Sequence, residues 1–240
     1  EERNKVISFT IDRVAGRVPV IAGTGTNNTL HAIDFSVNAD KAGADALLVV
    51  TPYYNKATQN GLIAHFTAIA DKVTKPIILY NVPSRTGCNL LPATVEKLAE
   101  HPNVAAIKEA SGNMSQVVEL FARCGDKIDV YSGEDGLTVP MLAMGGMGAI
   151  SVLSNVIPKG AVEMTDAFFA GDLRKAAALQ CRYLDLINLL FCEVNPIPVK
   201  YAMNVLGWNA GECRLPLVEP SDEHKTKIEQ ALAEAGLIKE

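Results

Sequence analysis

The chain has 240 residues, of which 48% are hydrophobic and 20% charged, and its formal net charge is −5. This hydrophobic share fills a sizeable core and excludes a disordered chain, while the mild acidity offers no basic surface for phosphates and argues against a nucleic-acid partner. The longest apolar runs, 46–50 and 189–192, are far shorter than the roughly 20 residues that cross a bilayer, so no membrane partner is expected. The cysteines lack C-x-x-C spacing and predict free thiols in a cytoplasmic protein.

Apolar runs and amphipathic stretches alternate along the chain and predict strands followed by helices. The run 45–51 (DALLVVT) stops at Pro52, and the stretch 59–73 behind it places Leu62, Phe66 and Ile69 on one helical stripe. Runs that are apolar at both odd and even positions are typical of strands covered on both faces. The alternation of strands and helices predicts parallel strands with right-handed crossovers. The predicted strands are 17–23, 45–51, 76–81, 104–108, 128–132 and 148–152.

Two architectures fit such a series of strands. One is an open six-stranded sheet, and the other is a (β/α)8 TIM barrel, typically of about 250 residues, whose first two strands are absent from this chain. The barrel is favoured because an open parallel sheet leaves an unpaired edge where the chain begins. The first residues also read as a crossover helix without a preceding strand, with an apolar face of Val6, Phe9, Ile11 and Val14.

The last part of the chain shows no strand pattern. Residues 1–154 are therefore predicted to be the barrel portion, and residues 155–240 to be the last barrel helix and a C-terminal helical region of the same compact unit. No linker separates the two parts. Helices are predicted to start near Pro158, Asp172, Pro196 and Ser221.

Lys108 lies at the carboxyl end of a predicted strand, where parallel α/β folds carry their chemistry. Its strand, VAAIK, is apolar up to the last residue, so the ammonium is delivered to the mouth of the sheet. Desolvation lowers the pKa of such a lysine and frees an amine that forms a Schiff base with a carbonyl. The alternative is an ordinary lysine that reaches out to water or pairs with Glu109.

Two tyrosines and an arginine lie near the same edge of the sheet. Tyr80 ends the preceding strand, about 4.8 Å away, so its hydroxyl can lie over the lysine amine and exchange protons there. Tyr54 follows the predicted strand 45–51 and could join them. The alternative is that the Tyr-Tyr pair after Pro52 is an amphipathic rim, which is common. Arg85, in the next loop, is suited to bind a carboxylate bidentately, or else is a solvated loop charge.

Three other patterns do not support a site. Gly23-Thr-Gly25 follows a strand and opens a helix, but it lacks the third glycine of a dinucleotide fingerprint and the acidic residue that ends the next strand. The histidines share no ligand spacing, so no metal site is predicted. Ser151 lacks the G-x-S-x-G setting of a nucleophile elbow.

Five segments carry motifs of a known enzyme family: TPYYN at 51–55, YNVPSRTG at 80–87, IKEASGN at 107–113, SGED at 132–135 and NPIPVK at 195–200. In this order and at this spacing, across essentially the whole chain, they resemble the 4-hydroxy-tetrahydrodipicolinate synthases (dihydrodipicolinate synthases). These enzymes belong to the class I aldolase group that includes N-acetylneuraminate lyase. The lysine-bearing IKEA and the tyrosine-bearing YN mark the superfamily, whereas RTG after YNVPS points to the synthases.

The resemblance implies a (β/α)8 barrel with a C-terminal helical region, in agreement with the strand pattern. It implies that Lys108 condenses with pyruvate as a Schiff base and that Tyr80 donates and accepts protons above it. It implies further that Tyr54 reaches across a tight dimer interface to complete a neighbour's proton relay, within a homotetramer made of two such dimers.

The resemblance also implies the substrates. Arg85 matches the arginine that receives the carboxylate of L-aspartate 4-semialdehyde, and Gly133 and Ile150 match positions that line the pyruvate pocket. The implied reaction joins the semialdehyde to pyruvate in lysine and diaminopimelate biosynthesis. No cofactor and no metal are expected, because the lysine itself is the electron sink.

The chain departs from the family pattern in two places. The family's G-T-T-G-E segment, which ends its second strand and supplies a threonine of the proton relay, does not occur here, as expected if the first two strands are absent. Tyr53 and Asn27 match the pocket for the feedback inhibitor lysine. His31, however, stands where sensitive members tend to present an acidic residue, which argues against tight inhibition.

Two other functions compete with the synthase. A sibling aldolase would cleave a sialic or sugar acid to pyruvate, and Arg85 argues against it. A catalytically inactive regulatory or assembly subunit is the other alternative, suggested by the missing strands. Turnover separates the inactive subunit from both enzymes, since an inactive subunit would at most bind pyruvate and would form no product.

Overall fold

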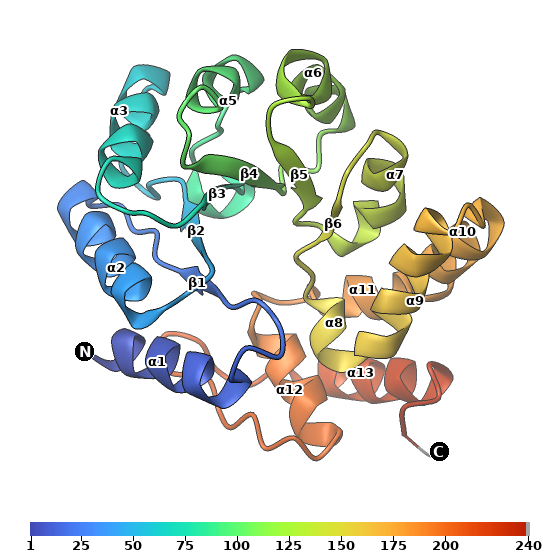
Figure 1. Ribbon diagram of the computed structural model, residues 1–240. Helices are drawn as coiled ribbons and strands as arrows, with labels where there is room; N and C mark the ends of the chain where they lie inside the picture. The colour runs from blue at the N-terminus through green and yellow to red at the C-terminus, as the bar shows by residue number, and fades with distance from the viewer. Residues whose placement is uncertain (239–240) are drawn as a thin grey trace. The chain divides into compact units, whose positions relative to one another are not determined.

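The computed structural model describes residues 1–238, and Figure 1 shows their helices and strands. The chain divides into two compact units. The first unit comprises residues 1–133 and 143–147, and the second comprises residues 134–142 together with those from 148 onward. The predicted barrel and helical portions, 1–154 and 155–240, stay a prediction.

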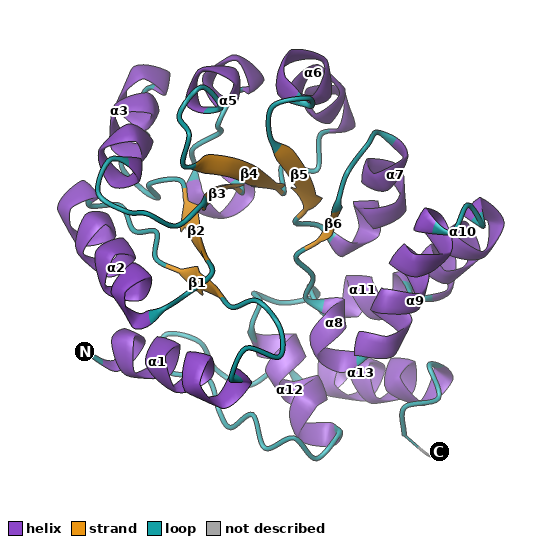
Figure 2. Ribbon diagram, viewed as in Figure 1, coloured by secondary structure: helices purple, strands orange, loops and turns teal. Residues whose placement is uncertain are grey.

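Parallel strands form the sheet of the first unit, and they pair in chain order as predicted. They are β1 (Ile21–Gly23), β2 (Ala46–Val50), β3 (Ile77–Asn81), β4 (Val104–Glu109) and β5 (Asp129–Ser132). Figure 2 shows that the helices of this unit, apart from the short one that directly follows β3, lie outside its strands. These helices are α1 (Glu2–Val14), α2 (Thr29–Ala42), α3 (Gln59–Ala70), α4 (Pro83–Thr86), α5 (Pro92–Leu98) and α6 (Met114–Cys124).

The sequence explains why the helices of this unit begin where they do. Asn28, Thr58 and Asn113 precede α2, α3 and α6, and each side chain accepts a hydrogen bond of 3.2 Å from the backbone N–H three residues later. Such caps satisfy backbone donors that have no partner inside the helix. The strands in between bury their apolar side chains; Leu47 and Leu79, for example, have no exposed surface. The predicted parallel α/β series is thus confirmed.

Two predicted strands are shorter than expected by three residues or more, and in both cases backbone N–H groups find other partners. Pro19 has no N–H to donate to a ladder, and the N–H of Val20 donates to the Asp45 carboxylate (2.7 Å), so β1 begins only at Ile21. The predicted strand 148–152 forms only at Gly148–Ala149, which is β6, because the N–H of Val152 donates to a carboxylate (2.9 Å) instead of a strand.

The second unit is mainly helical, as its sequence predicts. Its buried core includes Leu153, Met164, Leu186, Leu190 and Ile228. Besides β6, its elements are the 3-10 turn η1 (Asp135–Leu137), most of α7 (Thr138–Ala143), α8 (Leu153–Val156), α9 (Pro158–Phe169), α10 (Leu173–Arg182), α11 (Leu184–Leu189), α12 (Ile197–Val205) and α13 (Asp222–Glu234). The described residues contain six strands, so the eight-stranded barrel stays a prediction. In the same residues, no helix has the length and apolar composition to span a membrane.

His65 of α3 is an ionisable group buried in the first unit, with 5% of its surface exposed. Its Nδ1 lies 2.9 Å from the Thr29 hydroxyl of α2, and its Nε2 has no hydrogen-bond partner among the described residues. Burial lowers the pKa of this imidazole from 6.5 to about 4, because a charged ring is poorly solvated there. The folded protein therefore holds His65 neutral at pH 7.

We expect His65 to make the protein less stable in mild acid. Between pH 6.5 and about 4 the unfolded chain protonates His65 while the folded chain does not, so the free energy of unfolding falls as the pH falls through this window. The whole pKa shift corresponds to about 3 kcal/mol of unfolding free energy. None of this free energy is lost above pH 6.5, and all of it is lost below pH about 4. Urea unfolding across this window should show a shallower pH dependence for His65→Asn, which removes the imidazole, than for the wild type. The exposed His31 supplies the control, and equal slopes for wild type and His65→Asn would contradict the expectation.

Candidate active site

Tyr80 and Lys108 lie side by side at the carboxyl ends of β3 and β4. The parallel register places Tyr80 opposite Lys108, and the Lys108 Nζ lies 4.2 Å from the centre of the Tyr80 ring. Both residues are half-buried. An ammonium over an aromatic face is attracted by the ring, which helps to hold the amine beside the phenol. The predicted juxtaposition of these two residues is confirmed.

The environment of Tyr80 keeps its phenol protonated at neutral pH. Burial raises the pKa of Tyr80, and the positive charge of Arg85 acts in the opposite direction. Desolvation is the larger of the two effects, and it raises the pKa because it disfavours the phenolate. A protonated phenol is able to donate a proton, and the charge of Arg85 makes its phenolate easier to form.

Gly133 follows β5 and lies against the side chain of Lys108. A Cβ added at this position would lie 2.9 Å from both Cγ and Cε of Lys108, and 2.7 Å from the Cβ of Ala110. Cβ atoms do not approach other side chains so closely, and any larger residue would push the lysine stem away. The glycine therefore leaves room for Lys108 in the position that it occupies.

A cavity of about 350 Å³ lies in the first unit beside these strand ends, a size within the range of small-ligand sites. It brings Tyr80 and Arg85, predicted for the active site, together with Tyr53, which was predicted for the lysine-inhibitor site; Lys108 and Gly133 are not among its lining residues. Its lining residues are Gly23, Gly25, Leu48, Val50, Tyr53, Tyr80, Val82, Arg85 and Thr86.

Gly25 also explains the glycine pattern after β1. A Cβ at Gly25 would lie 2.4 Å from the backbone nitrogen of Val50, so the chain must have a glycine to pass β2 at this distance. Packing against a neighbouring strand accounts for this glycine, in agreement with the rejection of a dinucleotide fingerprint.

Tyr54 does not line this cavity. Its side chain is 89% exposed, and its backbone has a φ of 73°, in the left-handed region that residues other than glycine seldom adopt. The conformation is held by a hydrogen bond of 3.1 Å from its N–H to the carbonyl of Thr86. The structure thus fixes the backbone of Tyr54 and leaves its phenol accessible.

The residues predicted for lysine binding lie around the loops after β1 and β2. The hydroxyl of Tyr53 is 3.3 Å from that of Thr26, and the Asn55 side chain donates to the carbonyl of Asn27 (2.9 Å). His31 is exposed in the first turn of α2. Tyr53 and Asn27 thus belong to linked loops, and a role in lysine binding stays a prediction.

Ile150 belongs to the second unit, where it follows β6 and is half-buried. The residue that shapes this segment is Asp135 of the SGED motif, which was not among the predicted site residues. Its buried carboxylate accepts hydrogen bonds from the N–H groups of Val152 (2.9 Å) and Leu153 (2.8 Å), and thereby ends β6 and begins α8. An acidic residue just after a strand was the available signal.

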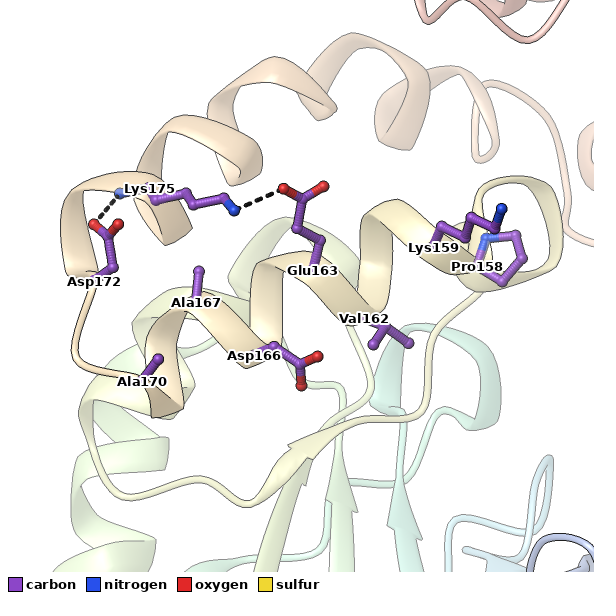
Figure 3. A pocket seen from close by; sticks show the side chains of 9 residues that line it. All are labelled: Pro158, Lys159, Val162, Glu163, Asp166, Ala167, Ala170, Asp172 and Lys175. Carbon is purple, nitrogen blue, oxygen red and sulfur yellow. Dashed lines mark hydrogen bonds and ion pairs between the residues drawn. The ribbon is translucent and has the colours of Figure 1, made fainter.

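A larger hollow of about 680 Å³ lies along α9 and α10 in the second unit (Figure 3). Three of its charged residues bind one another: the Lys175 ammonium lies 2.8 Å from the Glu163 carboxylate, and the Lys175 backbone N–H donates to the Asp172 carboxylate (3.0 Å). None of the residues predicted for the active site is among those that line it. The cavity at the strand ends of the first unit is therefore the candidate active site.

A parallel α/β fold with an amine, a phenol and a guanidinium at the carboxyl ends of its strands has the architecture of an enzyme. Comparison with known proteins agrees with this class. The model of the dihydrodipicolinate synthetase family matches residues 1–235. The chain belongs to this family, which confirms the resemblance seen in its motifs.

Close relatives share both sequence and fold. The 4-hydroxy-tetrahydrodipicolinate synthase of Thermoanaerobacter pseudethanolicus is 53% identical over 241 residues, which cover 100% of this chain and 81% of that protein. The crystal structure of dihydrodipicolinate synthase from Aquifex aeolicus gives a TM-score of 0.97 at 45% identity, covering 100% of this chain and 82% of that one. The Acinetobacter baumannii enzyme, solved in complex with pyruvate, gives 0.96 at 43% identity, with coverage of 99% and 81%.

Proposed function

We propose that this protein condenses pyruvate, held as a Schiff base on Lys108, with L-aspartate 4-semialdehyde to give 4-hydroxy-tetrahydrodipicolinate in lysine and diaminopimelate biosynthesis. The observation that carries the proposal is the Lys108 amine 4.2 Å from the Tyr80 ring, at the carboxyl end of a parallel sheet. Membership of the dihydrodipicolinate synthetase family and a relative of that activity at 53% identity support the same reaction.

The chemistry requires only the lysine and a proton shuttle. The Lys108 amine attacks the ketone of pyruvate and water leaves, forming an imine whose protonated form withdraws electrons from the methyl carbon. Loss of a methyl proton gives an enamine, whose carbon then attacks the aldehyde of the second substrate, and the aldehyde oxygen takes up a proton. The amino group of the semialdehyde finally displaces the lysine amine, which closes the ring and frees Lys108.

Tyr80 is the proposed proton shuttle for these steps, because its phenol is protonated and lies beside the amine. Tyr54 is proposed to complete the relay of a neighbouring subunit in a homotetramer built from tight dimers. Its 89% exposure and its hydrogen-bonded backbone support this role, since the phenol is available to a partner. Gly133 and Ile150 are proposed to line the pyruvate pocket, within a (β/α)8 barrel and a cytoplasmic enzyme.

The proposed inhibitor site for lysine comprises Asn27, Tyr53 and His31. The histidine is exposed and offers no carboxylate for the ammonium group of lysine. We therefore propose weak inhibition at most.

Replacing Arg85 with alanine is expected to weaken the use of the semialdehyde far more than the use of pyruvate. A lost charge-assisted hydrogen bond is worth about 1.5–3 kcal/mol, which corresponds to an increase of roughly 10- to 150-fold in the KM for the semialdehyde. Borohydride trapping of the pyruvate imine should stay close to that of the wild type. Arg85→Lys keeps the charge and loses the fork of donors, so its KM for the semialdehyde should lie between those of the wild type and Arg85→Ala. Equal damage to both substrates would assign Arg85 a structural role instead.

The function itself is tested by supplying purified protein with both substrates and measuring product formation. We expect 4-hydroxy-tetrahydrodipicolinate to form without added metal or cofactor. An imine without product would support the inactive-subunit alternative, and cleavage of N-acetylneuraminate to pyruvate would support a sibling aldolase. Either result would overturn the proposal.

A further inference from the structure

Two buried polar residues, Asn81 and Glu109, end the same strands that carry Tyr80 and Lys108. The register places Asn81 opposite Glu109, one residue beyond the pair of Tyr80 and Lys108. Successive side chains of a strand point to opposite faces, so this second pair lies behind the first, on the other face of the sheet. Asn81 is 0% exposed and Glu109 is 2% exposed.

The Glu109 carboxylate links the two strands and the segment that follows β4. Its Oε2 accepts a hydrogen bond from Asn81 Nδ2 (3.0 Å), and its Oε1 accepts one from the N–H of Ser111 (2.6 Å). A buried carboxylate is costly unless donors are directed at it, and here both oxygens have one. The carboxylate therefore holds Asn81 of β3 and the chain after Lys108 in one fixed arrangement.

Asn81 also fixes the loop that carries Arg85. This loop leaves β3 at Asn81 and returns to its side chain, because Asn81 Oδ1 accepts a hydrogen bond from the N–H of Leu90 (2.9 Å). Its Nδ2 donates to Asn89 Oδ1 as well (2.9 Å), and the Asn89 amide donates in turn to Gln116 of α6 (2.8 Å). Both ends of the loop are thus tied to one buried amide.

We propose that Asn81 and Glu109 are positioning residues for the reaction, a proposal that rests on the proposed function. The cross-strand pair sets the position of the Tyr80 phenol against the Lys108 amine, and the bonds from Asn81 to the loop set the position of Arg85. Neither residue needs to touch substrate for this role. It predicts separate kinetic effects at the two ends of the network.

The cross-strand link is tested by Glu109→Gln. A glutamine amide faces two donors, from Asn81 and Ser111, and satisfies only one of them with its single oxygen. We expect kcat to fall by roughly 10- to 100-fold, the effect of misplacing reacting groups by about 1 Å, with little change in either KM. The loop link is tested by Asn89→Ala, which should instead raise the KM for the semialdehyde and leave imine trapping with pyruvate unchanged.

The double variant Asn81→Asp with Glu109→Gln is the rescue experiment. In it the amide at 109 donates to the carboxylate at 81 and accepts from Ser111, while the new carboxylate accepts from the N–H of Leu90. The Asn89 amide can rotate to donate to the same carboxylate. We expect this variant to recover most of the kcat that each single substitution loses.

Asn103→Ala supplies the matched control at the opposite end of β4. Asn103 directly precedes β4, and its amide donates to the carbonyls of Ala70 (3.0 Å) and Val73 (2.8 Å), so this variant loses two hydrogen bonds beside the same strand. We expect a lower melting temperature with unchanged kcat per imine-forming site. This comparison separates a loss of stability from a loss of positioning.

The outcomes are distinct. A wild type without product overturns the proposed function. If the wild type is active, two results would overturn the positioning role and leave the proposed function standing. One is that Glu109→Gln behaves like Asn103→Ala, and the other is that the folded double variant recovers no activity. Should Glu109→Gln fail to fold, the half-buried Asn89→Ala carries the test, and an unchanged KM for the semialdehyde would contradict the proposal.

Discussion

Lys108→Arg is expected to reduce turnover to the background of the assay. The guanidinium keeps the positive charge and most of the length of the side chain, but it stays protonated and offers no amine to attack pyruvate. Removing a catalytic nucleophile costs on the order of 10⁶-fold in kcat where it has been measured. The protein should still fold, because Lys108 is half-buried beside the Tyr80 ring and a guanidinium also stacks on an aromatic face.

The control for this substitution is Lys72→Arg, a conservative change at an exposed lysine outside the cavity. It should leave turnover unchanged. Measurable condensation by a folded Lys108→Arg variant, beyond trace wild-type protein, would show that another group performs the covalent step.

Tyr80→Phe is expected to lower kcat by about 10²–10⁴-fold, the range for a general acid–base group. The ring remains, so the contact with the Lys108 ammonium persists and pyruvate should still bind and form an imine, although more slowly. Because burial raises the pKa of Tyr80, the phenol is protonated at neutral pH, and its loss removes a donor rather than a charge. The change should therefore appear in kcat and much less in the KM for pyruvate.

Tyr131→Phe is the matched comparison for Tyr80. Tyr131 lies opposite Lys108 on the other side, in β5, and burial raises its pKa as well. We expect only a small effect there, because the motif assigns the shuttle to the preceding strand. A loss of turnover under about threefold in Tyr80→Phe, far below the general acid–base range, would contradict the role of Tyr80.

The fold and the central pair of the site follow from the sequence because they depend on local patterns. Apolar runs mark the strands, and the last residue of each strand lies at the same edge of a parallel sheet. Lys108 and Tyr80 could therefore be placed together before any distance was known. The start of β1 was less predictable, since it depends on Pro19 and on a hydrogen bond between Val20 and Asp45, residues that are 25 positions apart.

The supporting residues could not be predicted in the same way. Asn81 and Glu109 are adjacent to Tyr80 and Lys108 in sequence, and a polar residue that closes an apolar run most often meets solvent. Their burial and their contact depend on the register between two strands and on the return of a loop at Leu90. The burial of His65 likewise depends on the packing of α2 against α3, which no spacing of histidines reveals.

The most direct test of the central claim is to trap the pyruvate adduct with borohydride and locate it by peptide mass mapping. We predict a pyruvate-dependent mass increase on the peptide that contains Lys108, and the loss of that increase in Lys108→Arg. Pyruvate alone suffices for this measurement, so it does not depend on the second substrate or on product release. An adduct on a different lysine, or no pyruvate-dependent adduct in the wild type, would contradict the account.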